Sequence, residues 1–321
     1  MKIGYHASHE QFSPRELLQL VQKAEQAGFT CALSSDHFHP WSNTQGESGF
    51  AWSWLGAAMQ ATNLEFGIVN APGQRYHPAI IAQAVATLDQ MFPARFWIAA
   101  GSGQALNENI TGDKWPEKEI RNKRLKESVE VMRELWKGDY VTHHGEITVE
   151  NAKLFTVPET SPMILGAALT QKTAQWIAPW TDGLITVSQP MDGLRKFVHA
   201  YRQVAGPHKP MILKVQISFE RNYETARTGA WEQWKNNIFP SSLLSDITTP
   251  DKFDALGQNI RKEDVAEKVL ISDSADFFIQ NINEFAGLGF DKIIIHNVNH
   301  NQESFIEFFG SEVLPSIKQT M

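Results

Sequence analysis

Eight apolar runs recur along the chain, and each has the length of one β-strand. Most of them are continuously apolar and do not alternate with polar residues. Continuous apolar strands are typical of parallel sheets, because other elements cover both faces of such sheets. The pattern therefore predicts parallel strands over residues 2–7, 31–36, 65–70, 95–101, 163–168, 183–187, 211–219 and 292–298.

Amphipathic stretches lie between these runs and repeat apolar residues every three or four positions, which is the spacing of a helix. We expect helices over residues 14–28, 78–91, 119–138 and 274–289. The first ends at a glycine and the second opens with a proline, as helices commonly do. Eight strands alternating with helices predict an α/β fold, the (β/α)₈ TIM barrel. A doubly wound sheet is the second choice, since it more naturally uses five or six strands.

Two segments interrupt this alternation. Residues 139–158 predict one or two β-hairpins, with Gly145 in a turn. Residues 223–262 contain Trp231 and Trp234, followed by a loop rich in Ser, Thr and Asp. An insertion of that length is either a lid over a substrate or a packing decoration. We expect one domain over residues 1–321 that carries both insertions.

Composition excludes several classes of protein. The 321 residues are 42% hydrophobic and 20% charged, with a formal net charge of −7 and no basic stripe, which argues against a nucleic-acid partner. No apolar run approaches the roughly 20 residues that span a bilayer, and the N-terminal residues lack a signal-peptide pattern. Cys31 is the single cysteine, so neither an intrachain disulfide nor a Cys-based zinc site is expected. We expect a cytoplasmic protein of enzyme size.

The active site of a (β/α)₈ barrel lies at the carboxyl ends of its strands. Polar residues that follow the apolar runs should therefore converge at one mouth. These residues are His6, Ser35, Asp36, His37, Asn70, Ser102, Gln104, Asn107, Thr170, Ser188, Gln189, Ser218, His296, Asn297 and His300. The set is rich in neutral hydrogen-bonding groups and poor in Lys and Arg. It suits a large planar heterocycle with one imidazole near the reacting carbon.

Other chemistries are less well supported. The set has no carboxylate pair of the glycosidase kind and no Ser-His-Asp arrangement. The GSG stretch at 101–103 is a weak dinucleotide signal, because Leu106 occupies the position of the third glycine. Asp36 could be a simple helix cap and His37 a core histidine. Their joint position at the mouth is what favours a functional role.

A metal-dependent hydrolase is an alternative reading of His37 and His39, which form an H-x-H pair. Barrel hydrolases place such a pair after the first strand and need an aspartate after the eighth. Here the pair follows the second strand, and the eighth ends in HNVNH. We therefore expect no metal ligand, and take His143 and His144 as part of a solvated hairpin.

Four sequence blocks resemble the bacterial-luciferase-like flavin monooxygenase superfamily in order and spacing. They are SSDHFHPW (34–41), RYHPAIIAQAVATL (75–88), GSGQALNE (101–108) and ESVEVMRELWKG (127–138). Within that superfamily they look most like the branch of deazaflavin (F420)-dependent glucose-6-phosphate dehydrogenases, over nearly the whole chain. The resemblance implies a barrel that binds a flavin-type ring across its strand ends, usually as a homodimer.

The resemblance also implies roles for individual residues. His37 and Trp41 match an active-site histidine and tryptophan beside the reactive ring carbon, and Gln104 stands at a catalytic position. Asp36 and Asn107 match residues that bind the cofactor, and Val69 and Asn70 fall near a non-prolyl cis peptide that supports the ring. Further positions expected to line the cofactor are Ala168, Leu169, Thr170 and Ser188.

Departures from that branch change the expected reaction. Gln104 replaces a glutamate taken as the proton donor, and an amide cannot act as a general acid. Pro190 and Leu244 replace two cations that hold a sugar phosphate, and only Lys268 keeps its charge. Glucose-6-phosphate is therefore not the expected substrate. The branch has Gly-Gly near Ala168, where it admits the cofactor phosphate, and its loss favours the shorter FMN over F420.

These observations lead to one preferred function and three alternatives. We expect a flavin-dependent oxidoreductase or monooxygenase with FMN, acting on a small organic substrate and supplied with electrons by a flavin reductase or a nicotinamide. The first alternative is an F420-dependent dehydrogenase or reductase of an uncharged substrate. The others are the metal-dependent hydrolase and a sensor that holds flavin without turnover.

Overall fold

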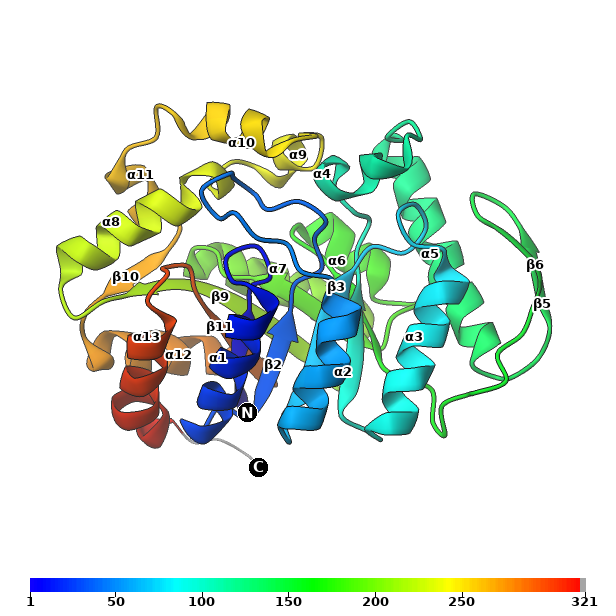
Figure 1. Ribbon diagram of the computed structural model, residues 1–321, viewed down its shortest axis with the longest axis horizontal. Coiled ribbons are helices and arrows are strands. Elements are labelled where there is room, and N and C mark those ends of the chain that lie inside the picture. Colours follow the sequence, from blue (N-terminus) through cyan, green and yellow to red (C-terminus); the bar gives the residue numbers. More distant parts are fainter. Residues whose placement is uncertain (318–321) are drawn as a thin grey trace.

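The computed structural model describes residues 1–317, in which eight parallel strands close into a barrel surrounded by helices (Figure 1). This arrangement confirms the (β/α)₈ prediction. The barrel strands are β1 (Lys2–Ala7), β2 (Cys31–Ser34), β3 (Glu65–Asn70), β4 (Phe96–Ala100), β7 (Ile164–Ala167), β8 (Gly183–Val187), β9 (Met211–Phe219) and β11 (Lys292–Asn297).

The strands pair in chain order around the barrel, and pairing of β9 with both β8 and β11 closes it. A further short strand, β10 (Leu270–Ser272), pairs in parallel with the last three residues of β9. β2 ends at Ser34, two residues earlier than the sequence predicted, so Ser35 and Asp36 already belong to the mouth. His6 lies inside β1 rather than after it.

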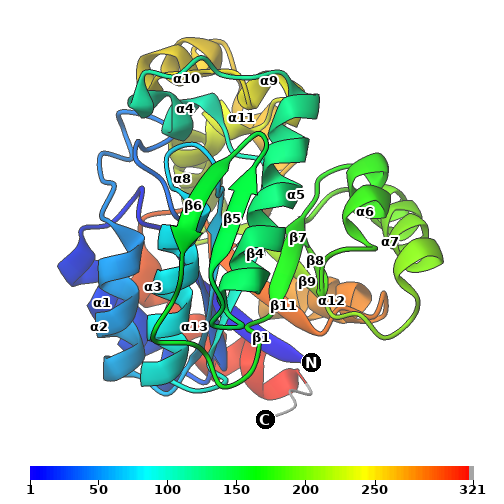
Figure 2. The same cartoon turned by 90° about the vertical axis from the view of Figure 1, so that its right-hand side faces the viewer.

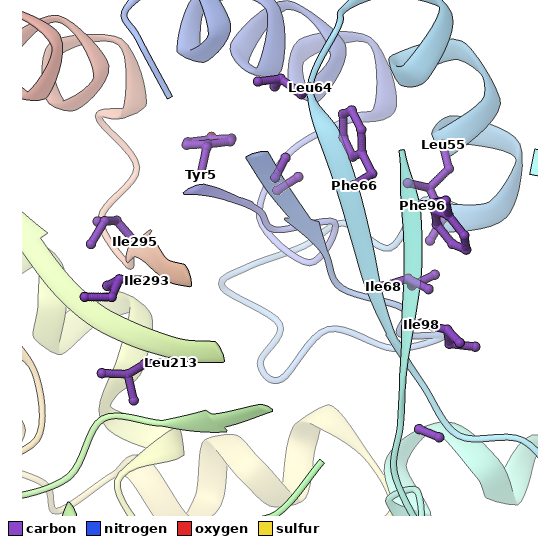
Figure 3. Packing of buried hydrophobic residues seen from close by; sticks show 14 of the residues in the cluster. Tyr5, Leu55, Leu64, Phe66, Ile68, Phe96, Ile98, Leu213, Ile293 and Ile295 are labelled. Atoms are coloured by element: carbon purple, nitrogen blue, oxygen red, sulfur yellow. The ribbon is translucent and has the colours of Figure 1, made fainter. Parts of the chain in front are cut away.

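Successive residues of each strand point alternately outside and inside the barrel, because the side-chain period of a strand is two. Outward residues such as Phe66, Phe96 and Leu213 join the large apolar core shared with the helices (Figure 3). In that core the ring of Trp52, from α2 (Ala51–Ala61), lies 6.0 Å from the ring of Phe96. This layer fastens the helices to the barrel.

The lower half of the barrel interior is filled by side chains. Trp97 packs there with Cys31, Leu33, Ala99, Leu165, Ile185, Ile212 and Ile294. The indole lies against the backbone of Gly67, where a Cβ atom would come within 2.1 Å of the ring. Below it, Glu65 forms ion pairs with Lys2 and Lys292. The inward-facing polar side chains of the strands therefore lie in the upper half of the interior, near the mouth.

Helices cover the outside of the barrel between successive strands. They follow each of the first four strands and also β7, β8, β10 and β11. Among them, α2, α6, α7 and α13 were not predicted from the sequence. Their bounds are α1 (Pro14–Gln26), α3 (Pro78–Met91), α4 (Ala105–Glu108), α5 (Lys118–Leu135), α6 (Gln171–Ile177), α7 (Met191–Ala205), α12 (Ala275–Ala286) and α13 (Gln302–Phe308). α1 begins where Ser13 accepts a hydrogen bond from the N–H of Glu16, an ordinary N-cap.

Both predicted insertions form regular structure. Residues 139–158 contain one antiparallel hairpin, β5 (Val141–His144) with β6 (Thr148–Ala152), which lies outside the barrel beside α5 (Figure 2). The second insertion is helical and lies across the barrel end opposite the N-terminus (Figure 1). Its helices are α8 (Tyr223–Trp234), α9 (Ser241–Leu244), α10 (Pro250–Gly257) and α11 (Lys262–Ala266).

Within residues 1–317, the helices are too short or too polar for any of them to traverse a lipid bilayer.

The contact between Gly67 and Trp97 predicts that one added methyl group at position 67 strongly destabilises the fold. Gly67→Ala should lower the free energy of unfolding by about 3 kcal/mol, because the indole and the neighbouring strand cannot both move away. Gly56→Ala in α2 is the matched control, since a Cβ atom there meets nothing within 4 Å. It should be neutral or stabilise by up to about 1 kcal/mol. Urea unfolding measures both, and equal effects would contradict this packing.

Candidate active site

Asp36 stands just beyond β2 and is held by three side chains at the barrel mouth. Its Oδ2 accepts a hydrogen bond of 2.6 Å from the amide of Asn70, and its Oδ1 accepts one of 3.1 Å from the hydroxyl of Tyr76. A guanidinium nitrogen of Arg75 lies 3.4 Å from the same Oδ1 and donates to the carbonyl of Asp36 at 2.9 Å. The carboxylate is therefore buried, compensated and fixed in direction.

Arg75 connects this carboxylate to a second one, Glu108. The backbone N–H of Arg75 donates to Glu108 at 2.8 Å, and its Nε lies 3.6 Å from the other carboxylate oxygen. Burial raises the pKa of Glu108 to about 7, although the positive charge of Arg75 opposes that shift. One arginine thus ties the loop after β3 to both the β2 and the β4 ends of the barrel.

Glu10 forms a second charged group on the β1 side of the mouth. Its carboxylate accepts hydrogen bonds from the hydroxyls of Ser8 at 2.9 Å and Ser35 at 2.7 Å, and lies 3.3 Å from Nδ1 of His37. Burial alone would raise the pKa of Glu10, but the imidazole and the two hydroxyls outweigh it and hold that pKa below its usual value. Glu10 therefore remains a carboxylate and orients the ring of His37.

His37 and Trp41 lie side by side under an apolar cover. Their ring centroids are 4.8 Å apart, and the indole meets Phe253 of α10 edge-on at 5.3 Å. Burial lowers the pKa of His37 even though Glu10 opposes that shift, so the imidazole is neutral at pH 7. The apolar cluster above it consists of Leu106, Leu244 and Phe253, with Trp41, Phe239 and Ile247 at its edge.

The cover is anchored by polar contacts at its rim. The amide of Asn43 donates to Asp251 at 2.7 Å and to Asp254 at 2.8 Å. The N–H of Ala105 donates to the carbonyl of Ser245 at 2.8 Å. The second insertion is thus bonded to the loops after β2 and β4, as a lid would be.

Asn107 and His39 hold the loop after β2 in place. The side-chain oxygen of Asn107 accepts hydrogen bonds from the N–H groups of Phe38 at 2.8 Å and His39 at 3.2 Å. Nδ1 of His39 lies 2.8 Å from the carbonyl oxygen of Leu106. Nowhere in residues 1–317 do three or more His, Cys, Asp or Glu side chains gather in a way that could hold a metal ion. The metal-hydrolase alternative therefore has no ligand cluster in that part of the chain.

A polar layer fills the barrel interior just beneath the mouth. The rings of His6 and His296 are 4.2 Å apart, and His296 also meets Trp234 of α8 edge-on at 4.9 Å. Lys214 of β9 projects into the same layer, with Nζ 6.0 Å from the centroid of Trp234. Burial lowers the pKa of both histidines, and the charge of Lys214 lowers it further.

The predicted residues do gather at one mouth, with differences in detail. Asp36, His37, Trp41, Asn70 and Asn107 form the connected group described above, whereas His6 and His296 lie in the polar layer beneath it. Among residues 1–317 every peptide bond is trans, so the expectation of a cis peptide near Val69 and Asn70 is wrong.

The positions after β7 and β8 lie on the opposite rim. Ala168 is buried and its N–H donates to the carbonyl of Ile185 at 3.1 Å, whereas Leu169 is 48% exposed. Thr170 caps α6 by accepting from the N–H of Thr173 at 3.2 Å. Ser188 donates to the side chain of Gln216 at 3.0 Å.

Sequence reasoning missed several residues of the site. Glu10, Arg75, Tyr76, Glu108 and Lys214 all take part in it. Glu10 lies four residues after His6 and Glu108 directly follows Asn107, so a wider window at the strand ends would have found both. Lys214 lies inside β9, whose sequence MILKVQISF alternates the polar residues Lys214, Gln216 and Ser218 with apolar ones. This period of two is the signal that could have revealed it.

The mouth has features that fit a planar ring with amide-like edges. Oδ1 of Asn70 is buried and has no hydrogen-bond partner within residues 1–317, so it can accept from a ring N–H. The amide of Gln104 is half-buried at the entrance to α4. Trp41 and the apolar cover supply a face against which a ring can pack.

Comparison with known proteins agrees with this geometry. Residues 1–292 match the luciferase-like monooxygenase family. The chain is 33% identical to the F420-dependent glucose-6-phosphate dehydrogenases of Mycolicibacterium gilvum and Rhodococcus erythropolis, with 99% of this chain and 98% of each relative covered.

Solved structures give the same answer for the fold. An F420-dependent secondary alcohol dehydrogenase, in complex with an F420-acetone adduct, superposes with a TM-score of 0.91 at 31% identity, covering 99% of both chains. A tetrahydromethanopterin reductase from Methanopyrus kandleri reaches 0.79 at 18% identity, which speaks for the fold alone. The chain is an oxidoreductase that belongs to the luciferase-like monooxygenase family.

Proposed function

We propose that this protein is an F420-dependent dehydrogenase that transfers a hydride between the deazaflavin and a small uncharged alcohol or ketone. The observation that carries this proposal is the apolar cover over His37 and Trp41, built from Leu106, Leu244 and Phe253. Such a cover suits an uncharged substrate and excludes water from the mouth. The F420-dependent relatives, one of them a secondary alcohol dehydrogenase, support the cofactor and the substrate class.

A sugar phosphate fits the same site poorly. Leu244 is buried in the apolar cover, where the related dehydrogenases resembled by the sequence have a cation. Pro190 is exposed and carries no charge, and Lys268 is exposed just before β10. A phosphate dianion needs several charge-assisted hydrogen bonds to offset its desolvation. We therefore propose that glucose-6-phosphate is not the substrate.

FMN is a second candidate cofactor, and one observation favours it. Ala168 and Leu169 stand on the rim beside β7, and their side chains occupy space that a Gly-Gly pair would leave open. That space matters for the longer tail of F420 and less for FMN. With FMN bound, the same site could serve the oxygen-inserting chemistry expected from the sequence.

Different residues of the mouth would bind different parts of the cofactor ring. Asn70 and Asp36 bind its polar edge, and Arg75 keeps the Asp36 carboxylate compensated. Nδ1 of His37 faces Glu10, so its Nε2 is free to accept a hydrogen bond from the bound ligand. The ring supplies or accepts the hydride, which no side chain can do. The homodimer and a partner that recycles the cofactor stay predictions.

The ion pair between Glu10 and His37 predicts a measurable pKa difference. Glu10→Gln should lower the pKa of His37 further, because burial already favours the neutral imidazole and the carboxylate is the main opposing influence. Histidine NMR titration of the cofactor-free protein measures the change. Glu150→Gln, beside the exposed His144 of the hairpin, is the control and should leave His37 unchanged. An unchanged His37 titration in Glu10→Gln would contradict the contact.

Cofactor binding tests the ring site directly. F420 should quench the tryptophan fluorescence of the protein at micromolar concentration, and Asp36→Ala should weaken its binding at least tenfold. Asp182→Ala removes a carboxylate that pairs with Arg133 at the other end of the barrel, and should leave the affinity unchanged. Tight binding of FMN without binding of F420 would replace the first candidate by the second. Binding of neither would overturn both.

Turnover separates the possible substrates. The F420-loaded enzyme should reduce F420 with 2-propanol. It should be inactive with glucose-6-phosphate, because the site has too few cations to bind a phosphate. Absorbance of oxidised F420 follows both reactions. If activity with glucose-6-phosphate equals or exceeds activity with 2-propanol, the assignment of an uncharged substrate is wrong.

A further inference from the structure

We propose that Lys214 is the residue that exchanges a proton with the substrate's oxygen during hydride transfer. The inference rests on the proposed function, since it concerns the same site, and it names an acid–base group on the β9 side of the barrel, away from Glu108. It also refines the substrate to one whose reacting carbon bears a hydroxyl or carbonyl oxygen.

The direction of Lys214 follows from the alternation of β9. Its neighbours Leu213 and Val215 belong to the outer core, whereas Ile212 belongs to the interior cluster of the barrel. Lys214 therefore points inward, one turn of the pleat above Ile212. It pairs in register with Ile294 of β11, which is also an interior residue.

The position of β9 in the barrel places Lys214 across from the ring-holding residues. Going around the barrel from β3, the order is β4, β7, β8 and then β9, so four of the eight steps separate the two strands. Asn70 ends β3, and Asp36 follows the neighbouring β2. A substrate lying between these residues and β9 would meet Lys214.

The ammonium group of Lys214 is left without a partner by the protein. Among residues 1–317 no side chain or carbonyl forms a hydrogen bond or ion pair with its Nζ; the contact that stands out is the face of Trp234 at 6.0 Å. Protein surrounds the side chain, yet part of its surface remains accessible within the barrel. A buried cation without an acceptor is costly, and a substrate oxygen would satisfy it.

The charge state of Lys214 suits proton exchange near neutral pH. Burial lowers its pKa to about 8, although Glu10 opposes that shift. The other titratable groups that face it are His6 on β1, His37 after β2 and His296 on β11, and burial keeps all three neutral at pH 7. Gln104 is an amide. Lys214 is thus the group in this layer that still holds a proton it can release.

The proposed step balances in both directions. In reduction, the carbonyl carbon gains a hydride from the reduced deazaflavin and the oxygen gains a proton from Nζ, so that C–H and O–H bonds form as the C=O π bond is lost. The deazaflavin loses two electrons as the hydride and its ring N–H proton to solvent, and Lys214 is left as the neutral amine, which regains a proton from solvent. In alcohol oxidation, the neutral amine takes the hydroxyl proton, and the oxidised deazaflavin gains the hydride from carbon and a ring proton from solvent.

The pH dependence of the wild-type enzyme provides the first test. Acetone reduction should fall as pH rises through about 8, because the donor form of Lys214 is lost there. Oxidation of 2-propanol should rise through the same pH, because the amine form is gained. The proposal would be overturned if the reduction rate did not fall, or the oxidation rate did not rise, as pH increases through about 8.

Three variants separate proton exchange from other roles of the side chain. Lys214→Met should lower kcat at least 100-fold in both directions and remove the limb near pH 8. Lys214→Arg keeps the positive charge, but arginine does not release its proton near neutral pH. Its kcat should therefore fall as well, whereas a purely electrostatic role of Lys214 would leave kcat of this variant near the wild-type value. Lys196→Met removes the same charge from the exposed face of α7 and should behave as wild type. Rates of Lys214→Met within threefold of wild type would contradict the proposal.

Two further measurements keep this inference distinct from the cofactor assignment. F420 affinity should be the same in wild type and Lys214→Met, so that lost turnover does not reflect lost binding. In the cofactor-free protein, the ε-carbon NMR signal that disappears in Lys214→Met should titrate with a midpoint near 8. A midpoint near the ordinary lysine value would overturn the role of Lys214 even if F420 binds and turns over. Failure of F420 to bind would overturn the proposed function instead.

Discussion

Closure of the barrel is the constraint on which the rest of the structure depends. In a closed parallel sheet each strand must send successive side chains alternately out to the helices and in to a narrow interior. The outward positions can be uniformly apolar, and they form the large core. The inward positions have to share limited space, so a Trp97 on one strand requires a Gly67 on the next. Chemistry is confined to the inward positions near the mouth.

The same closure explains why the site is a network of charges rather than isolated groups. Loops that leave neighbouring strands emerge side by side, so Asp36, Arg75 and Glu108 come from three separate strand ends and still meet. Glu10 and His37 meet in the same way across β1 and β2. Asp36, Glu108 and Glu10 are each paired there, as the low polarity around the mouth demands. Lys214 differs in having no hydrogen bond or ion pair to its Nζ among residues 1–317, and a buried charge left so points to function.

Much of this could be predicted from the chain, and the failures have physical causes. Continuous apolar runs gave the eight barrel strands, because helices hide both faces of the sheet. The residues directly after those runs gave Asp36, His37 and Asn70. Lys214 was missed because it lies inside β9 and not after its end. The alternation of Lys214, Gln216 and Ser218 with apolar residues marks one face of β9 as polar, but it does not tell whether that face lies inside the barrel. Contacts made by loops, such as Arg75 with Glu108, depend on how the backbone turns after a strand. Spacing in the sequence does not record that turn.

The plug formed by Trp97 above the Glu65 ion pairs has a kinetic consequence. It seals the barrel from below, so the mouth beneath α9 and α10 is the way in and the way out for everything that reaches Lys214. Cofactor and substrate would therefore share one opening, and the anchors between Asn43 and α10 would govern how fast both are exchanged.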